Sequence, residues 1–280
     1  MRLIIDSNQI SRFPNSNDLS KFAGKCDGIT LAPYVLAEVI ISEKHTQYLS
    51  RIRGFDVKLG LEPEYVGEIV AGLSKDQIST FEPFLERTHH FYVDYERAMR
   101  DPSPDDIASA KRRKDRSLEI CVALRDAAKE YRRLAQKDEG VRHLRFHNME
   151  EALSSEFGRG NDSFLSLHVS SFISAASTRP VVESNELLNV VMCNQFLRRF
   201  FMTFFYYSLA MFHLWEEQRG NVDPREYRDD WTDLSLPLYA KDGDIIVSED
   251  RLLRKAIKMV EPQGSISVKS WKEMQQCFNI

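Results

Sequence analysis

The sequence predicts an α/β fold in which both ends of the chain form one parallel sheet and a mostly helical insertion separates them. The first observation is the short apolar run Leu3–Ile5, which stops at Asp6. The second is the run Ile245–Val247, which also stops at polar residues. Short apolar runs of this kind are typical of strands that are buried on both faces of a sheet. The third is the helical character of the region between them. We therefore assign residues 1–54 and 223–280 to the core and residues 55–222 to the insertion.

The first part of the core reads as strand, helix, strand, helix. A second strand is predicted at Gly28–Leu31, and polar residues at 14–17 mark a turn before it. Pro33 suits a first helical turn, where its missing N–H is not needed. The pattern after Pro33 runs helically to Arg53, before Gly54.

The insertion carries no strand signal as clear as those at the chain ends. Pro63 and Ser74 are candidate helix starts, and residues 101–105 form a break that offers an N-cap for the next helix. We expect that helix at about Ile107–Lys137, and a further helical stretch at Glu183–Glu217.

The second part of the core returns to short elements. A helix is predicted across Trp231–Ala240, and the strand at Ile245–Val247 is followed by a second helix. A last strand at Ile266–Val268 and a helix from Lys269 or Ser270 complete the predicted elements of the core. Both chain ends thus alternate strands with helices.

Composition limits the function classes. A chain of 280 residues that is 42% hydrophobic can bury a substantial core, so extensive disorder is not expected. The formal charge of -4 excludes a uniformly basic coat for nucleic acid, so any basic surface must be local. The four cysteines are too scattered for a zinc ribbon or a redox motif, and no signal peptide precedes Asp6. We expect a cytoplasmic protein.

The segment Phe200–Trp215 is almost entirely apolar. It is shorter than the roughly 20 residues that a membrane-spanning helix needs, and it contains Thr203, Ser208 and His213. A buried helix or an oligomer interface is favoured over a membrane anchor. The anchored alternative predicts that the expressed chain enters the membrane fraction.

Five carboxylates carry the functional hypothesis. Asp6 and Asp250 each follow a strand, and ligands in open parallel sheets bind outside the carboxyl ends of the strands. Glu38 lies near the start of the helix after the second strand, while Asp230 and Asp233 are three residues apart on one helix. Such acids repel one another unless a cation neutralises them. Mg²⁺ or Mn²⁺ prefers these oxygen ligands and can activate water against a phosphodiester.

Four segments together resemble the PIN-domain nucleases. They are Leu3-Ile4-Ile5-Asp6-Ser7-Asn8, Leu31-Ala32-Pro33-Tyr34-Val35-Leu36-Ala37-Glu38, Asp229-Asp230-Trp231-Thr232-Asp233-Leu234-Ser235-Leu236-Pro237-Leu238-Tyr239-Ala240 and Gly243-Asp244-Ile245-Ile246-Val247-Ser248-Glu249-Asp250-Arg251-Leu252-Leu253-Arg254. The resemblance covers about the first 54 and the last 55 residues. The region between them is much longer than the helical middle of comparable domains.

The resemblance implies a Rossmann-like sheet and a metal-dependent nuclease. PIN-domain enzymes include toxins of toxin and antitoxin pairs, RNA-processing factors and DNA flap nucleases, and we favour single-stranded RNA as the substrate. The implied catalytic residues, which are also metal ligands, are Asp6, Glu38, Asp233 and Asp250. Asp230 would be an auxiliary metal ligand. Ser7 and Asn8 would steady the first carboxylate or contact substrate.

Each of these acids also has a purely structural interpretation. Asp6 and Asp250 suit turns or N-caps, Glu38 suits a solvated helix face, and Asp230 and Asp233 suit an acidic helix start. Asp244 is expected only to end a turn before its strand.

A basic run on the long helix is a candidate contact for the phosphate backbone: Lys111, Arg112, Arg113 and Lys114, with Arg132 and Arg133 further along the same helix. A solvated face that pairs with Asp115, Glu119 and Asp126 explains the same run. His143 and His147 have the spacing of metal ligands, but no acid or cysteine nearby completes a set.

Two other functions compete with the nuclease. One is a PIN-like scaffold without activity that binds RNA or a protein partner, or forms a homodimer, through the insertion. The other is a phosphohydrolase of the haloacid dehalogenase type, which needs a second aspartate two residues after the first. Asn8 occupies that position, so its general acid would be missing.

Overall fold

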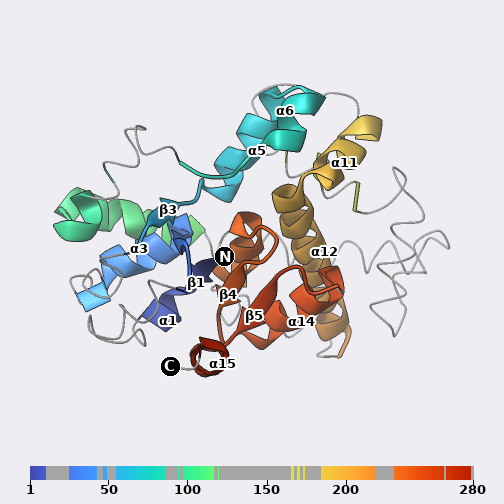
Figure 1. Ribbon diagram of the computed structural model, residues 1–280. Coiled ribbons are helices and arrows are strands. Elements are labelled where there is room, and N and C mark those ends of the chain that lie inside the picture. The colour runs from blue at the N-terminus through green and yellow to red at the C-terminus, as the bar shows by residue number, and fades with distance from the viewer. Residues whose placement is uncertain are drawn as a thin grey trace. The chain divides into compact units, whose positions relative to one another are not determined.

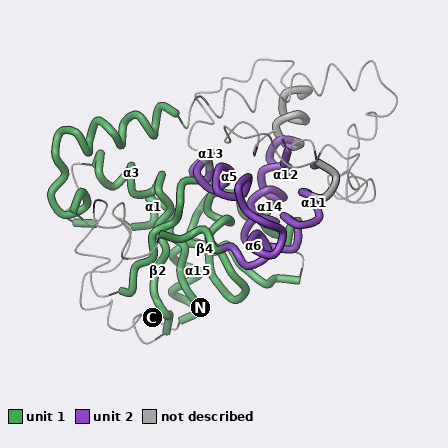
Figure 2. The backbone as a smooth tube through the Cα atoms, turned by 90° about the horizontal axis from the view of Figure 1, so that it is seen from above, with its two compact units in different colours: residues 1–62, 82–117, 235–280 green, residues 63–81, 118–234 purple. Residues whose placement is uncertain are grey.

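The computed structural model describes residues 1–10, 25–42, 47–48, 55–85, 94, 97–116, 119, 165–166, 169–170, 173, 184–217, 230–261 and 263–278. These residues divide into two compact units (Figure 2). Unit 1 contains residues 1–62, 82–117 and 235–280, and unit 2 contains residues 63–81 and 118–234. A compact unit is not in itself a domain, so the domain boundaries near 54 and 223 stay a prediction.

Unit 1 is built on a five-stranded parallel sheet with the strand order β3-β2-β1-β4-β5 (Figure 1). The strands are β1 (Arg2–Ile5), β2 (Gly28–Leu31), β3 (Val57–Leu59), β4 (Ile245–Val247) and β5 (Ser267–Lys269). In the register, Leu3 lies opposite Ile29 on one side and Ile245 on the other. The predicted α/β fold with a parallel sheet from both chain ends is therefore confirmed.

Burial explains which strands the sequence revealed. Every residue of β1, β2 and β4 is buried, so each central strand is a continuous run without polar alternation. β3 lies at the sheet edge, and two of its three residues are only half-buried. The sequence interpretation missed β3, because a run of three with a lysine at its centre has no strand signature.

Helices flank the strands of unit 1. They are α1 (Ser7–Ile10), α3 (Pro33–Ile41), the 3₁₀ turn η4 (Leu236–Tyr239), α14 (Arg251–Val260) and α15 (Trp271–Phe278). Pro33 begins α3 as predicted, but α3 ends at Ile41, where Ser42 is extended, rather than continuing to Arg53.

An additional helix spans residues 104–116 and packs against α3. Ser103 caps it: the Ser103 hydroxyl accepts from Asp106 N at 3.2 Å, and the Asp106 carboxylate accepts from Ser103 N at 2.9 Å. The predicted N-cap in this break is thus confirmed. Hydrogen bonds from Arg97 and Ser103 hold the pKa of Asp106 below its usual range. The continuation to Lys137 lies outside the described residues.

Unit 2 is helical. Its described helices are α5 (Pro63–Gly72), α6 (Lys75–Thr80), α11 (Ser184–Cys193), α12 (Gln195–Glu217) and α13 (Asp230–Ser235), whose last residue is assigned to unit 1. Ser74 caps α6 in a reciprocal capping box with Gln77, as its position in the sequence predicts.

Asn194 separates α11 from α12 and is 2% exposed. Its side-chain oxygen accepts from Phe196 N at 2.9 Å and Leu197 N at 3.1 Å, which caps α12. Its amide nitrogen donates to Ile78 O at 2.8 Å and Phe81 O at 2.7 Å. One side chain therefore joins the start of α12 to the end of α6.

The apolar segment of α12 is buried on all sides from Phe200 to Ser208. A helix that is apolar around its whole circumference belongs to a protein core when it is too short to span a bilayer. Within the described residues, the search for a helix with the length and hydropathy of a membrane span finds none.

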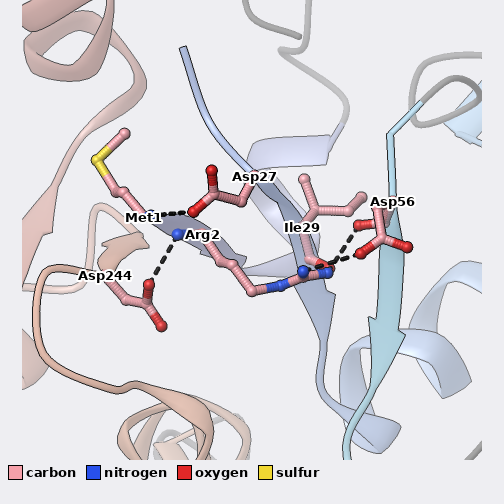
Figure 3. A network of polar contacts seen from close by, with 6 residues as sticks. All are labelled: Met1, Arg2, Asp27, Ile29, Asp56 and Asp244. Carbon is pink, nitrogen blue, oxygen red and sulfur yellow. Dashed lines mark hydrogen bonds and ion pairs between the residues drawn. The ribbon is translucent and has the colours of Figure 1, made fainter. Parts of the chain in front are cut away.

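A polar network fixes the amino edge of the sheet (Figure 3). The Arg2 guanidinium donates to the Asp56 carboxylate at 2.9 Å, to Asp56 O at 2.8 Å and to Ile29 O at 3.1 Å. Asp244 accepts from Arg2 N at 2.7 Å and from Lys241 N at 3.1 Å, so it serves the turn before β4 as expected. Gly28 makes this packing possible: its φ is +146°, and a Cβ there would lie 2.2 Å from Asp56 O.

Candidate functional site

The candidate site lies at the carboxyl edge of the sheet, where β1 and β4 end side by side. β1 pairs with β2 on one side and with β4 on the other, so the chain connections diverge at this point. Ligands in open α/β sheets bind at such topological switch points. Asp6 follows β1 directly, and Ser248 follows β4. The Asp6 N–H donates to Val247 O at 3.1 Å, which joins the two strand ends.

Asp6 is a buried carboxylate held by two hydroxyl groups. Its residue exposure is 5%. Ser248 Oγ lies 3.1 Å from Asp6 Oδ2, and Ser7 Oγ lies 3.3 Å from Asp6 Oδ1. A buried carboxylate is costly unless hydrogen bonds or a cation compensate it. Both hydroxyls come from residues that the strand ends position.

Ser7 also connects Asp6 to Glu38, which projects from α3. The Ser7 hydroxyl donates to Glu38 Oε2. Because both carboxylates contact the same hydroxyl, their nearest oxygens lie at most about 6 Å apart, twice the length of a hydrogen bond. A serine has a single proton to donate, so it cannot satisfy both acids at once.

Lys114 places a positive charge beside Glu38. Its ammonium nitrogen lies 3.4 Å from Glu38 Oε1. It reaches Glu38 because Ala110, one turn earlier on the same helix face, packs against Ala37 of α3. Ser248 was not among the predicted site residues, and Lys114 was predicted only as a contact for the phosphate backbone. The signals for them were the i, i+4 spacing from a small apolar residue and the position directly after an apolar strand.

Asp250 acts as the N-cap of α14. Its carboxylate accepts from Leu253 N, and its own N–H donates to Ser248 Oγ at 3.1 Å. This agrees with the capping interpretation. Ser248 therefore connects the backbone of Asp250 to the carboxylate of Asp6, while the Asp250 carboxylate is engaged with its own helix.

The remaining predicted acids belong to unit 2. Asp233 is half-buried on α13, and Asp230 begins that helix. Convergence of these two acids with Asp6 and Glu38 stays a prediction. Asn8 lies in α1, and its side chain is outside the described part of the protein.

The basic residues predicted to contact RNA differ in exposure and in ion pairing. Lys111 and Arg112 are exposed on the 104–116 helix. Arg113 is half-buried and forms an ion pair with Glu62, with Nε 2.6 Å from Oε1. The cations at 113 and 114 thus pair with acids from other parts of unit 1. His143 and His147 lie outside the described residues.

The donor chemistry suits a hard cation only in part. In the described ranges, no group of three or more histidine, cysteine, aspartate or glutamate side chains has the arrangement of a metal site. Mg²⁺ often binds through one or two carboxylates while waters and substrate phosphates complete its coordination. The oxygens of Asp6 and Glu38 meet that minimum, with Lys114 as the competing cation.

Comparisons of the chain with protein-family models, with curated proteins and with solved structures found no match.

Proposed function

We propose that the chain is a metal-dependent nuclease that hydrolyses phosphodiester bonds in single-stranded RNA in the cytoplasm. The observation that carries the proposal is the hydrogen-bonded pair of carboxylates, Asp6 and Glu38, bridged by Ser7 at the switch point of a parallel sheet. The ordered resemblance of the chain ends to PIN-domain nucleases supports the same assignment.

Asp6 and Glu38 are the residues that would hold Mg²⁺ or Mn²⁺. When bound, such an ion supplies charge neutralisation at the phosphate and lowers the pKa of water. Ser248 and Ser7 orient the Asp6 carboxylate from two sides. Lys114 keeps Glu38 neutralised in the free protein. Asp233, Asp250 and Asp230 are proposed as further ligands of the same site.

A cleavage assay tests this proposal. The full chain is incubated with labelled single-stranded RNA and Mn²⁺, beside Asp6→Asn. Asp105→Asn is the matched control, because Asp105 is an exposed aspartate of the same unit. We expect cleavage that needs the metal, is lost in Asp6→Asn and is kept in Asp105→Asn. Equal cleavage by Asp6→Asn would identify a contaminating nuclease and contradict the proposal.

A second candidate is a PIN-like scaffold that binds RNA or a protein partner without cleaving. Two observations favour it: Glu38 already has an ammonium partner, and the Asp250 carboxylate caps its own helix. The same assay separates the two, since a scaffold binds RNA with no turnover at any Mn²⁺ concentration.

A further inference from the structure

The strongest unassigned feature of unit 1 is a basic face on α14. Four cations recur at the spacing i, i+3, i+4, i+7, which places them on one side of a helix: Arg251, Arg254, Lys255 and Lys258. Three of these, Arg251, Lys255 and Lys258, are exposed, and Arg254 is half-exposed. In a chain whose net charge is -4, this is a local concentration of positive charge.

Little in the described structure neutralises this face. Arg254 forms a bidentate pair with Glu273, with nitrogen to oxygen distances of 2.9 and 2.8 Å. Within the described residues, Arg251, Lys255 and Lys258 have no ion-pair partner. An ordinary solvated helix face alternates acids with bases, whereas this face carries no acid of its own.

The face also borders a hollow. A surface pocket of about 440 Å³ is lined by Arg251, Arg254, Lys255 and Glu249. It is largely open to solvent. Three of its four lining residues are cations, so the pocket suits an anion. Glu273 from α15 keeps the Arg254 guanidinium in a fixed orientation beside it.

The basic face begins one residue after Asp250, whose backbone is connected to the candidate site. Asp250, directly before Arg251, is linked through the Ser248 hydroxyl to the Asp6 carboxylate. From Arg251 to Lys258 the face extends about 10 Å, at the rise of an α-helix.

We propose that the basic face of α14 is a binding surface for the phosphate backbone of single-stranded RNA, leading to the carboxylate pair. The proposal rests on the proposed nuclease function for the identity of the ligand. A lipid surface is the other anionic partner that a basic amphipathic helix fits. It is disfavoured because the apolar face of α14 is already in the core: Leu253, Ala256 and Ile257 are at most 3% exposed.

Binding is measured without turnover. A short fluorescent single-stranded RNA is titrated with the full chain in EDTA, by anisotropy, over a series of salt concentrations. The test variant combines Arg251→Ala, Lys255→Ala and Lys258→Ala, and it leaves the Arg254 ion pair intact. The matched pair of single variants is Lys255→Ala and Lys241→Ala, since Lys241 is an exposed lysine outside α14, in the turn before β4. Circular dichroism verifies that each variant is folded.

Each phosphate contact contributes about 0.7 to the salt slope, which is about fivefold in affinity at 0.1 M salt. We expect the triple variant to lose about two units of slope and about a hundredfold in affinity. Lys255→Ala should lose about fivefold and Lys241→Ala nothing. Binding of the triple variant like that of the parent chain would overturn the proposal. So would binding to anionic vesicles in place of RNA, or no RNA binding by the parent chain.

Two results distinguish a failure of the proposed RNA-binding surface from a failure of the proposed nuclease function. RNA binding that depends on the basic face, with no cleavage in Mn²⁺, would retain the surface and remove the enzyme. Cleavage that the triple variant performs with the affinity of the parent chain would retain the enzyme and remove the surface.

Discussion

Replacing Ser7 with alanine tests the hydroxyl bridge between the two carboxylates. The Ser7 hydroxyl contacts both Asp6 Oδ1, at 3.3 Å, and Glu38 Oε2. A hydrogen bond to a charged acceptor contributes about 1.5–3 kcal/mol. Without the Ser7 hydroxyl, the two carboxylates, whose nearest oxygens lie at most about 6 Å apart, lose a hydrogen-bond donor that they share. In EDTA, Ser7→Ala should therefore lower the free energy of unfolding by about 2 kcal/mol.

Added metal should reverse part of this loss. A ligand at a hundred times its Kd stabilises the folded state by about 2.7 kcal/mol. In the parent chain, a metal at Asp6 and Glu38 takes over the charge compensation that the Ser7 hydroxyl supplies, so the hydroxyl contributes less to stability once the metal is bound. With saturating Mn²⁺, the difference between the two proteins should shrink to below about 1 kcal/mol.

Urea unfolding followed by circular dichroism, in EDTA and in Mn²⁺, measures both quantities. Ser79→Ala is the matched control, because the exposed Ser79 hydroxyl only donates to Asp76 O, at 2.7 Å. Its effect should stay within about 0.5 kcal/mol in both buffers. A loss in Ser7→Ala that is the same with and without Mn²⁺ would refute the reasoning that metal and hydroxyl serve the same oxygens.

Three further predictions concern the stability of the two units. Gly243→Ala should lower the free energy of unfolding by about 1–2 kcal/mol through left-handed backbone strain. Gly28→Ala should lower it further, because of the two sites only Gly28 has backbone where the Cβ would lie. Thermal unfolding of both variants checks which is less stable. Asn194→Ala should cost about 3 kcal/mol in urea unfolding through the lost cap and two unpaired carbonyls; a cost below about 0.5 kcal/mol would contradict the joint described for α6 and α12. Arg254 lowers the pKa of Glu273 from 4.5 to about 2, so its contribution is complete above about pH 4.5 and is lost as the pH falls toward 2. Glu273→Gln should accordingly flatten the decline in stability between pH 5 and pH 2, and an unchanged acid limb would count against the ion pair.

The sequence predicted the elements that local physics specifies. The central strands are apolar runs because both of their faces are buried. Ser74 and Ser103 are N-cap residues, which mark the starts of their helices in the sequence. The sequence did not predict β3, because this edge strand buries only one side chain and therefore lacks an apolar run. The sequence did not predict the end of α3 at Ile41, because no glycine or proline directly follows that residue.

The same division applies to the candidate site. Asp6 and Glu38 could be predicted from the sequence, because Asp6 directly follows a strand and Glu38 lies in the second turn of the helix after the next strand. Ser248 and Lys114 depend on tertiary structure. Ser248 reaches Asp6 only because β4 pairs with β1, and Lys114 reaches Glu38 only because the 104–116 helix packs on α3. A single sequence does not encode such pairings in any local pattern.

Direct titration with Mn²⁺ tests the central claim, that Asp6 and Glu38 hold a divalent ion together. Binding to the full chain is followed by calorimetry for the parent protein, Asp6→Asn, Glu38→Gln and the control Asp105→Asn. We predict one binding event that weakens at least tenfold in each of the first two variants and is unchanged in the control, since loss of one ligand of a shared ion costs about 1.4 kcal/mol or more. Parent-like binding by Asp6→Asn and Glu38→Gln, or no binding by the parent protein, would contradict it.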